Sequence, residues 1–280
     1  MDKNSRSNVI LLTGSRGFIG KELLIQSKKK NILFKTLNKE INLLRKNSIK
    51  YLNSCNVNTI FHLAGYVPKK MKEYNLKKNR NNLKIFKNII SSNIENIILI
   101  STYAFFKNRR KILESLPKNM QNLNEYSKVK LKIERTALNS KKKILIIRIP
   151  GIYGNDRRDG LIYNCIKALS NNRKFRLDEK LPTMHLMHID KLIEIFFKIL
   201  KKANKIKETK ILNLYNDKYV DISDVLKFIY KKLNKKPKQK IKLLKKEKVY
   251  ISQKNFRNFY NGRNDFYKYL NFEIKKITNI

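Results

Sequence analysis

Short apolar runs alternate with amphipathic segments through the first half of the chain. The apolar runs predict buried strands at residues 8–14, 31–37, 57–65, 94–102 and 142–150. The segments between them have the spacing of helices with one apolar face, which predicts helices at residues 18–30, 48–56, 81–93 and 124–140. Strands that are apolar almost throughout are typical of a parallel sheet covered by helices on both faces.

This alternation predicts an α/β fold, a doubly wound parallel sheet of the Rossmann type with a smaller C-terminal lobe. The rhythm breaks at Pro150, Gly151 and Gly154, so the predicted domains are residues 1–150 and 151–280. Beyond the break we expect strands at 183–189 and 210–216 and a helix at 222–233. Strands from about 184–215 are expected to join the first domain's sheet, and the lysine-rich stretch 235–248 is expected to be solvated surface.

The chain carries 65 basic and 21 acidic residues, a formal net charge of +44, which invites a nucleic-acid partner. The basic residues are scattered from end to end and are mostly lysine, the residue that A- and T-rich codons specify. Arginine, the preferred bidentate reader of phosphate and guanine, is not enriched. We therefore expect no specific nucleic-acid partner.

The sequence lacks the patterns of a membrane protein and of a cysteine metal site. No apolar run approaches the 18 residues of a membrane span, and the polar leader runs into only four apolar residues, so we expect a cytoplasmic protein with no membrane partner. Cys55 and Cys165 are far apart and lack metal-ligand spacing, so no metal site is predicted.

A glycine-rich stretch, "LLTGSRGFIG", lies between the first predicted strand and helix. Gly14, Gly17 and Gly20 are three of the chain's eight glycines. A missing Cβ allows a tight turn and lets the backbone approach a pyrophosphate, whose charge then lies at the helix N-terminus. The context of strand, loop and helix indicates a dinucleotide-binding loop.

The spacing and sequence of this loop resemble the extended short-chain dehydrogenase/reductase superfamily, also called the NAD-dependent epimerase/dehydratase family. Further segments are similar to its motifs: "FHLAG" at 61–65, Asn79, "ISTYAFF" at 100–106, the pair Tyr126 and Lys130, and "IIRIPGIYGND" at 146–156 with Arg148, Tyr153 and Gly154. The resemblance spans nearly the whole chain, although the last 40 residues carry little of it.

Tyrosine followed four positions later by lysine occurs six times in the chain, so the pattern has no value by itself. Tyr126 differs from the other five because it follows Thr102 by 24 residues, a distance the family commonly shows. The resemblance implies a catalytic set of Thr102, Tyr126 and Lys130. Tyr126 would exchange a proton with a sugar hydroxyl or ketone, Lys130 would hold the cofactor ribose, and Thr102 would hydrogen-bond the reacting oxygen. We expect the Lys130 ammonium and a nicotinamide ring to favour the Tyr126 phenolate.

The resemblance implies a reaction on a nucleotide-activated sugar, and departures from the family pattern limit which reaction that can be. Tyr103 and Ala104 stand where the family's dehydratases place an acidic pair, so dehydration is not expected. "STYAFF" resembles a segment of the dTDP-4-dehydrorhamnose reductases, and "KTLNKEINLL" at 35–44 resembles one of the GDP-fucose synthases. Epimerisation and keto-sugar reduction therefore stay open. A non-catalytic dinucleotide-sensing protein on the same fold is the alternative from another class.

The second predicted strand carries Lys35 near its end and is followed by Asn38 and Lys39, with no carboxylate at the end of the strand. Arg16 lies in the glycine loop. A positive corner suits a 2′-phosphate, so NADP is favoured over NAD. The residues expected to bind the dinucleotide are Gly14, Ser15, Arg16, Gly17, Phe18, Ile19, Gly20, Lys35, Asn38, Lys39, Leu63, Ala64, Gly65, Asn79, Tyr126, Lys130 and Pro150.

Other polar residues have weaker assignments. His62, His185 and His188 are expected to be structural, with His62 buried beside the nucleotide loop. The arginines at 157, 158, 173 and 176 fall in the smaller lobe, where a nucleotide-sugar diphosphate would need cations, although surface solvation explains them equally well. A homodimer packed through helices is common among relatives and is a further expectation.

Overall fold

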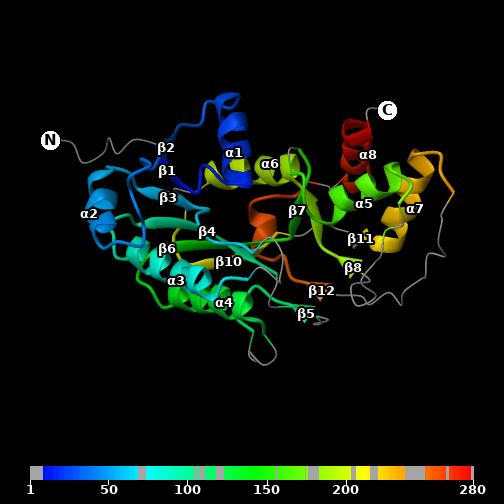
Figure 1. Cartoon of the computed structure of the whole chain (residues 1–280). Coiled ribbons are helices and arrows are strands. Elements are labelled where there is room, and N and C mark those ends of the chain that lie inside the picture. The colour runs from blue at the N-terminus through cyan, green and yellow to red at the C-terminus, as the bar shows by residue number, and fades with distance from the viewer. Residues whose placement is uncertain are drawn as a thin grey trace.

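A parallel six-stranded sheet forms the centre of the computed structural model (Figure 1). The structure describes residues 9–68, 74–103, 106, 111–117, 123–155, 157–173, 175, 183–202, 206–214, 220–236, 250–262 and 265–278. The sheet has the order β10-β6-β4-β3-β1-β2, and every neighbouring pair is parallel. Its strands are β1 (Ile10–Thr13), β2 (Phe34–Thr36), β3 (Thr59–His62), β4 (Asn96–Thr102), β6 (Lys143–Ile149) and β10 (Lys210–Asn213). The predicted fold class is confirmed.

Helices cover both faces of this sheet (Figure 1). On one face, α1 (Phe18–Lys28) and α6 (Ile189–Leu200) pack against alternate strand residues such as Leu12 and Leu145. On the other, α2 (Asn47–Ser54), α3 (Leu76–Ile90) and α4 (Glu125–Leu138) pack against the intervening ones, such as Leu11 and Ile146. Since side chains alternate across a strand, burial on both faces requires the nearly continuous apolar runs seen in the sequence.

A smaller lobe packs beside the carboxyl end of the sheet (Figure 1). Its helices are α5 (Leu161–Ser170), α7 (Ile222–Lys232) and α8 (Phe266–Thr278), which enclose a separate apolar core. Short two-stranded pairings join β7 (Gly151–Tyr153) with β9 (Leu186–His188), β8 (Thr183–Met184) with β11 (Val220–Asp221), and β5 (Lys111–Ile112) with β12 (Tyr250–Ile251). A short 3-10 helix, η4, spans Phe256–Asn258.

Several predicted boundaries differ from the structure. The helix predicted at 81–93 starts earlier, at Leu76, because the side chain of Asn75 caps it by accepting a hydrogen bond from the Lys78 backbone. The strand predicted at 183–189 is divided between β8 and β9. Helix α8 was not predicted, although Phe266, Leu270 and Ile274 recur at intervals of four and are all buried. Residues 237–248 of the lysine-rich stretch lie outside the described residues.

None of the helices in the described segments has both the length and the apolar character needed to cross a membrane.

Candidate active site

A cleft of about 1000 Å³ opens at the carboxyl ends of the central strands. The chain reverses its direction of winding between β1 and β3, since β2 lies on one side of β1 and β3 on the other. In open parallel sheets such a point leaves a crevice outside the strand ends, where ligands bind. The cleft is lined by Gly14, Arg16, Gly17, Phe18, Ile19, Gly20, Lys21, Glu22, Ile25, His62, Leu63, Ala64, Gly65, Val67, Pro68, Asn82, Leu99, Ile100, Ser101, Thr102, Tyr126, Lys130, Ile133, Ile149, Pro150, Gly151, Ile152, Arg157, Arg158 and Asp159.

Two glycines of the loop between β1 and α1 occupy positions where no other residue fits. Gly14 has φ +75°, and a Cβ on it would lie 2.6 Å from the backbone nitrogen of Ala64. A Cβ on Gly20 would overlap the carbonyl oxygen of Gly14. The Gly17 amide closes the turn by donating to that same carbonyl at 3.0 Å. The loop thus brings bare backbone and the first turn of α1 to the cleft, an arrangement that suits a pyrophosphate.

The ends of β1 and β3 are joined beneath this loop by Thr13 and His62. The Thr13 hydroxyl lies 2.8 Å from His62 Nδ1 and accepts a hydrogen bond from the Ala64 amide at 3.2 Å. Burial, and secondarily the nearby Lys130 ammonium, lower the pKa of His62 to about 3. His62 is therefore neutral at physiological pH, in line with the structural role expected beside the nucleotide loop.

Tyr126 and Lys130 lie one turn apart on α4, and both line the cleft. Helix α4 begins after Asn124, whose side chain accepts a hydrogen bond from the Ser127 amide. The Lys130 ammonium donates to the carbonyl of Ile100 at 3.3 Å. Thr102, at the end of β4, lines the same cleft, so the structure brings the three predicted catalytic residues together.

The protonation of this set differs from the expectation. Burial raises the pKa of Tyr126 to about 12, and no opposing effect of Lys130 is resolved. Burial also lowers the pKa of Lys130 to about 8, although the carboxylate of Glu134 acts in the opposite direction. In the protein alone, desolvation therefore outweighs the attraction that was expected to favour a phenolate. Tyr126 is therefore a neutral phenol, able to donate its proton, in the protein as the structure shows it.

Ser101 is a cleft residue that the sequence did not single out. It precedes Thr102 on β4 and is only 4% exposed. Among the described residues its hydroxyl has no hydrogen-bond partner, although it lines the cleft. A buried hydroxyl in this state is available to a ligand. The signal in the sequence was its adjacency to Thr102.

Five residues predicted to bind the dinucleotide are not among those that line the cleft: Ser15, Lys35, Asn38, Lys39 and Asn79. The Lys35 ammonium donates to the carbonyl of Cys55 at 3.2 Å. Asn79 is fully buried, and its amide donates to the phenolic oxygen of Tyr74 and, at 2.9 Å, to the carbonyl of Glu125. Asn79 therefore connects α3 to the start of α4. The other twelve predicted residues, Pro150 included, line the cleft.

Arg157 and Arg158 bring positive charge from the smaller lobe to the cleft. Arg157 is held by the Asp159 carboxylate at 2.6 Å and by the Ile152 carbonyl at 2.8 Å, and it lies 5.7 Å from the centre of the Phe18 ring. Arg173 is not a lining residue, and Arg176 lies outside the described residues. The sequence placed these arginines in the smaller lobe but could not tell which of them reach the cleft.

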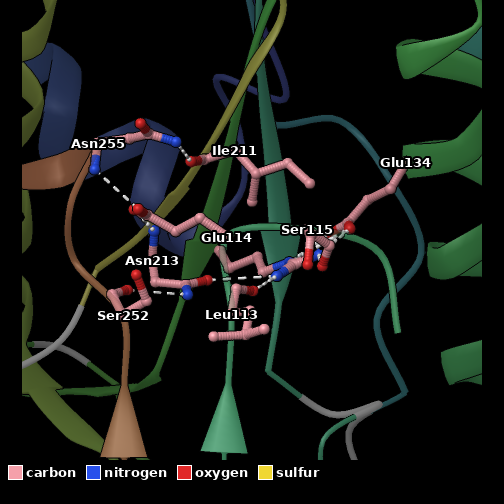
Figure 2. A network of polar contacts seen from close by, with 9 residues as sticks. Leu113, Glu114, Ser115, Glu134, Ile211, Asn213, Ser252 and Asn255 are labelled. Atoms are coloured by element: carbon pink, nitrogen blue, oxygen red, sulfur yellow. Dashed lines mark hydrogen bonds and ion pairs between the residues drawn. The ribbon is translucent and has the colours of Figure 1, made fainter. Parts of the chain in front are cut away.

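Arg148, a residue of the family-like motif, is fully buried and lies outside the cleft lining. Its guanidinium pairs with Glu134 of α4 at 2.6 Å. Figure 2 shows the surrounding polar network, which includes Glu114 and Asn213. In the part of the chain that the structure describes, no three His, Cys, Asp or Glu side chains are grouped so as to hold a metal ion.

Comparisons with known proteins agree with this fold. A family model described as RmlD substrate binding domain matches residues 8–254. UDP-glucuronic acid 4-epimerase from Bacillus cereus, solved with NAD, is 20% identical and has a TM-score of 0.73, with 97% of this chain and 99% of that one covered. UDP-glucose 4-epimerase from Thermus thermophilus, also solved with NAD, is 14% identical with a TM-score of 0.73, covering 96% and 98%. No curated protein sequence matches the chain.

Proposed function

The chain belongs to the family described as RmlD substrate binding domain, within the extended short-chain dehydrogenase/reductase superfamily, and we propose that it is an NAD(P)-dependent epimerase or reductase of a nucleotide-activated sugar. One observation carries the proposal: Thr102, Tyr126 and Lys130 line the same cleft as the glycine loop. Hydride transfer to or from a carbon bearing oxygen needs a proton donor or acceptor beside that oxygen. Tyr126 could serve as that group, next to the loop that would bind the hydride carrier.

The residues of the loop fit a dinucleotide. A Cβ on Gly14 or Gly20 would collide with neighbouring backbone, so these two glycines let the chain turn tightly and bring the start of α1 to the cleft. When bound, the dinucleotide accepts or supplies hydride at its nicotinamide ring. Backbone amides at the start of α1 would bind its pyrophosphate, and the Lys130 ammonium would hold its ribose hydroxyls.

The proton moves at the phenolic oxygen of Tyr126. In reduction of a ketone, Tyr126 donates its proton to the carbonyl oxygen while hydride arrives at the carbon, and in oxidation both transfers are reversed. Thr102 donates a hydrogen bond to the same oxygen. With its pKa raised to about 12 by burial, Tyr126 holds its proton at neutral pH and is in the form that donates it.

NADP is the cofactor that we propose. Arg16 lines the cleft beside the glycine loop, and β2 ends at Thr36 without a carboxylate for a ribose 2′-hydroxyl. Lys35, bonded to the Cys55 carbonyl, contributes less than the sequence suggested. Both solved epimerases described above are NAD complexes, so NAD is the alternative that the binding experiment has to exclude.

We also propose that two regions of the chain bind different ligands. Residues 1–150, with β10 added at the edge of the sheet, bind the dinucleotide. The remainder of residues 151–280, apart from β10 and α6, forms the substrate-binding lobe, which has its own apolar core and directs Arg157 and Arg158 into the cleft. Guanidinium groups at this position suit the diphosphate of a nucleotide sugar.

A panel of nucleotide sugars and nucleotide keto-sugars, incubated with and without NADPH, tests the proposed function. Consumption of NADPH with one substrate identifies a reductase, whereas exchange of sugar isomers without net consumption identifies an epimerase. Tyr126→Phe is expected to abolish turnover and to leave dinucleotide affinity within about twofold, since Phe keeps the ring. Dinucleotide binding without turnover of any sugar would favour the sensing protein, and full activity of Tyr126→Phe would refute the proposed site.

A further inference from the structure

Three residues on α4, Tyr126, Lys130 and Glu134, recur at intervals of four and so share one helix face. The first two line the cleft. Glu134 continues the same face into the protein interior, where it is fully buried. The catalytic face of the helix thus ends on a carboxylate that no solvent reaches.

Glu134 meets the guanidinium of Arg148 on β6. Arg148 Nη2 lies 2.6 Å from one carboxylate oxygen, and its Nε lies 3.0 and 3.2 Å from the two oxygens. Both side chains are 0% exposed. A buried pair with this geometry fixes how α4 is rotated against the sheet, because removing one partner would leave a buried charge uncompensated.

The guanidinium is itself held from several directions. It donates to the carbonyls of Leu113 at 2.8 Å and Ser115 at 3.0 Å, and it lies 4.8 Å from the centre of the Phe106 ring. Between those two carbonyls in the chain, Glu114 accepts hydrogen bonds from the backbone amides of Asn213, Asn255 and Phe256. Figure 2 shows Glu134 at one side of this polar network and Glu114, Asn213 and Asn255, from segments far apart in the chain, at the other. The anchor of α4 is therefore rigid.

The charges around Lys130 give Glu134 a second effect. Lys130 is directed toward the Ile100 carbonyl, and His62 on β3 and Tyr126 on its own helix are both neutral at physiological pH. Glu134 is the carboxylate whose charge opposes the effect of burial on the pKa of Lys130. Without it, Lys130 would lose its proton at a lower pH.

We propose that Glu134 is a positioning residue of the active site: through Arg148 it orients the face of α4 that carries Tyr126 and Lys130, and its charge keeps Lys130 in the ammonium form. This inference rests on the proposed function at one point, the binding of the dinucleotide by Lys130. If Glu134 were only a structural anchor, with no effect on the charge of Lys130, its replacement would leave the pH dependence of NADPH binding unchanged.

The test is the pH dependence of NADPH affinity, measured by fluorescence titration between pH 6 and 10 with no sugar present. In the wild type we expect affinity to fall above about pH 8, as Lys130 loses its proton. Glu134→Gln should lower this alkaline limit, the pH above which affinity falls, by about one unit. The loss of affinity should then be roughly fivefold at pH 8 and smaller at pH 6. Glu134→Asp keeps the charge, so its alkaline limit should stay near that of the wild type.

Because Glu134→Gln leaves the Arg148 charge buried and alone, the double variant Glu134→Gln/Arg148→Met is measured beside it. Removing both members of a buried pair is usually tolerated by the fold. The double variant has lost the carboxylate that raises the pKa of Lys130, and it has lost the Arg148 cation too, so its alkaline limit should be lowered by less than that of Glu134→Gln. A folded double variant with the wild-type pH dependence would overturn the inference. Failure of the wild type to bind any nicotinamide dinucleotide would instead refute the proposed function.

Discussion

The side-chain amide of Asn79 on α3 donates a hydrogen bond of 2.9 Å to the carbonyl of Glu125, the residue before Tyr126. Asn79 is fully buried and does not line the cleft. The sequence assigned it to the dinucleotide, whereas the structure shows it holding the first turn of α4. Residues on two helices thus cooperate to place one phenol.

Replacing Asn79 tests this contact. Asn79→Ala deletes a fully buried amide and its hydrogen bond to the Glu125 carbonyl, so we expect a loss of about 1–3 kcal/mol in the free energy of unfolding. Asn81→Ala, two positions along the same helix and only partly buried, should change it by less than about 0.5 kcal/mol. Urea unfolding of the two variants measures the difference, and equal stability would show that the Asn79 contact contributes nothing.

The glycine loop allows a matched pair of substitutions. Gly14→Ala places a Cβ at φ +75° and 2.6 Å from the Ala64 nitrogen, which should destabilise the fold by at least about 1–3 kcal/mol. Gly17 has φ −76°, and its nearest neighbour would lie 3.3 Å from an added Cβ. Gly17→Ala should therefore melt closer to the wild type than Gly14→Ala does. Thermal unfolding compares them, and the reverse order would contradict the loop geometry.

Burial of the Lys130 ammonium should lower the free energy of unfolding of the protein. Burial lowers its pKa from 10.5 to about 8, so between these values the folded state binds fewer protons than the unfolded chain. Stability therefore rises with pH across this window, and the full penalty is present below about pH 8. Lys130→Met should raise the free energy of unfolding at pH 7 by about 3 kcal/mol and remove that rise.

The control for this substitution is Lys128→Met on the same helix. Lys128 is 48% exposed and pairs with Glu125 at the surface. Its removal should change stability by less than about 1 kcal/mol and leave the pH dependence unaltered. Denaturant unfolding at pH 7 and pH 10 separates the two variants. Equal pH dependence in Lys130→Met and wild type would mean that Lys130 is not desolvated.

Arg16 should decide between the two dinucleotides. If its guanidinium binds the 2′-phosphate of NADP, Arg16→Ser should weaken NADPH about tenfold or more and leave NADH nearly unchanged. Lys28→Ser, at the exposed end of α1, removes the same charge away from the cleft and should affect neither. Calorimetric titration with both dinucleotides makes the comparison. Stronger binding of NADH than NADPH by the wild type would overturn the NADP proposal.

Glu114 should stabilise the attachment of the segment around η4 to the end of β10. Its carboxylate accepts three backbone amides, from Asn213, Asn255 and Phe256, even though burial raises its pKa. Glu114→Gln leaves fewer acceptor sites for these buried donors and should cost about 1–3 kcal/mol of unfolding free energy at pH 7. Glu208→Gln, which removes only a surface pair with Lys210, should cost less than about 1 kcal/mol. Chemical denaturation of both variants tests the ranking.

The order of elements and the glycine loop were readable from the sequence because their causes are local. A strand buried on both faces must be apolar at successive positions, as Leu11 and Leu12 are, and a turn at φ +75° selects glycine at position 14. The set of Thr102, Tyr126 and Lys130 was found only through the family resemblance, because the pattern of tyrosine and lysine occurs six times in the chain. Helix α8 was also encoded locally, in Phe266, Leu270 and Ile274, but its surroundings of lysine obscured it.

Other properties of the site depend on which residues become neighbours after folding. Lys35 and Asn79 had residue types that suit a cofactor, but packing directs Lys35 to the Cys55 carbonyl and Asn79 to the start of α4. The protonation of Tyr126 was also beyond the sequence, since desolvation depends on how much of the protein surrounds the phenol. The sequence by itself determined the fold class and the loop, because backbone geometry and apolar periodicity act over a few residues. Only the tertiary structure decided which charges are buried, how they are paired and which of them reach the cleft, because burial and Coulomb interactions join residues such as Glu134 and Arg148 from different elements.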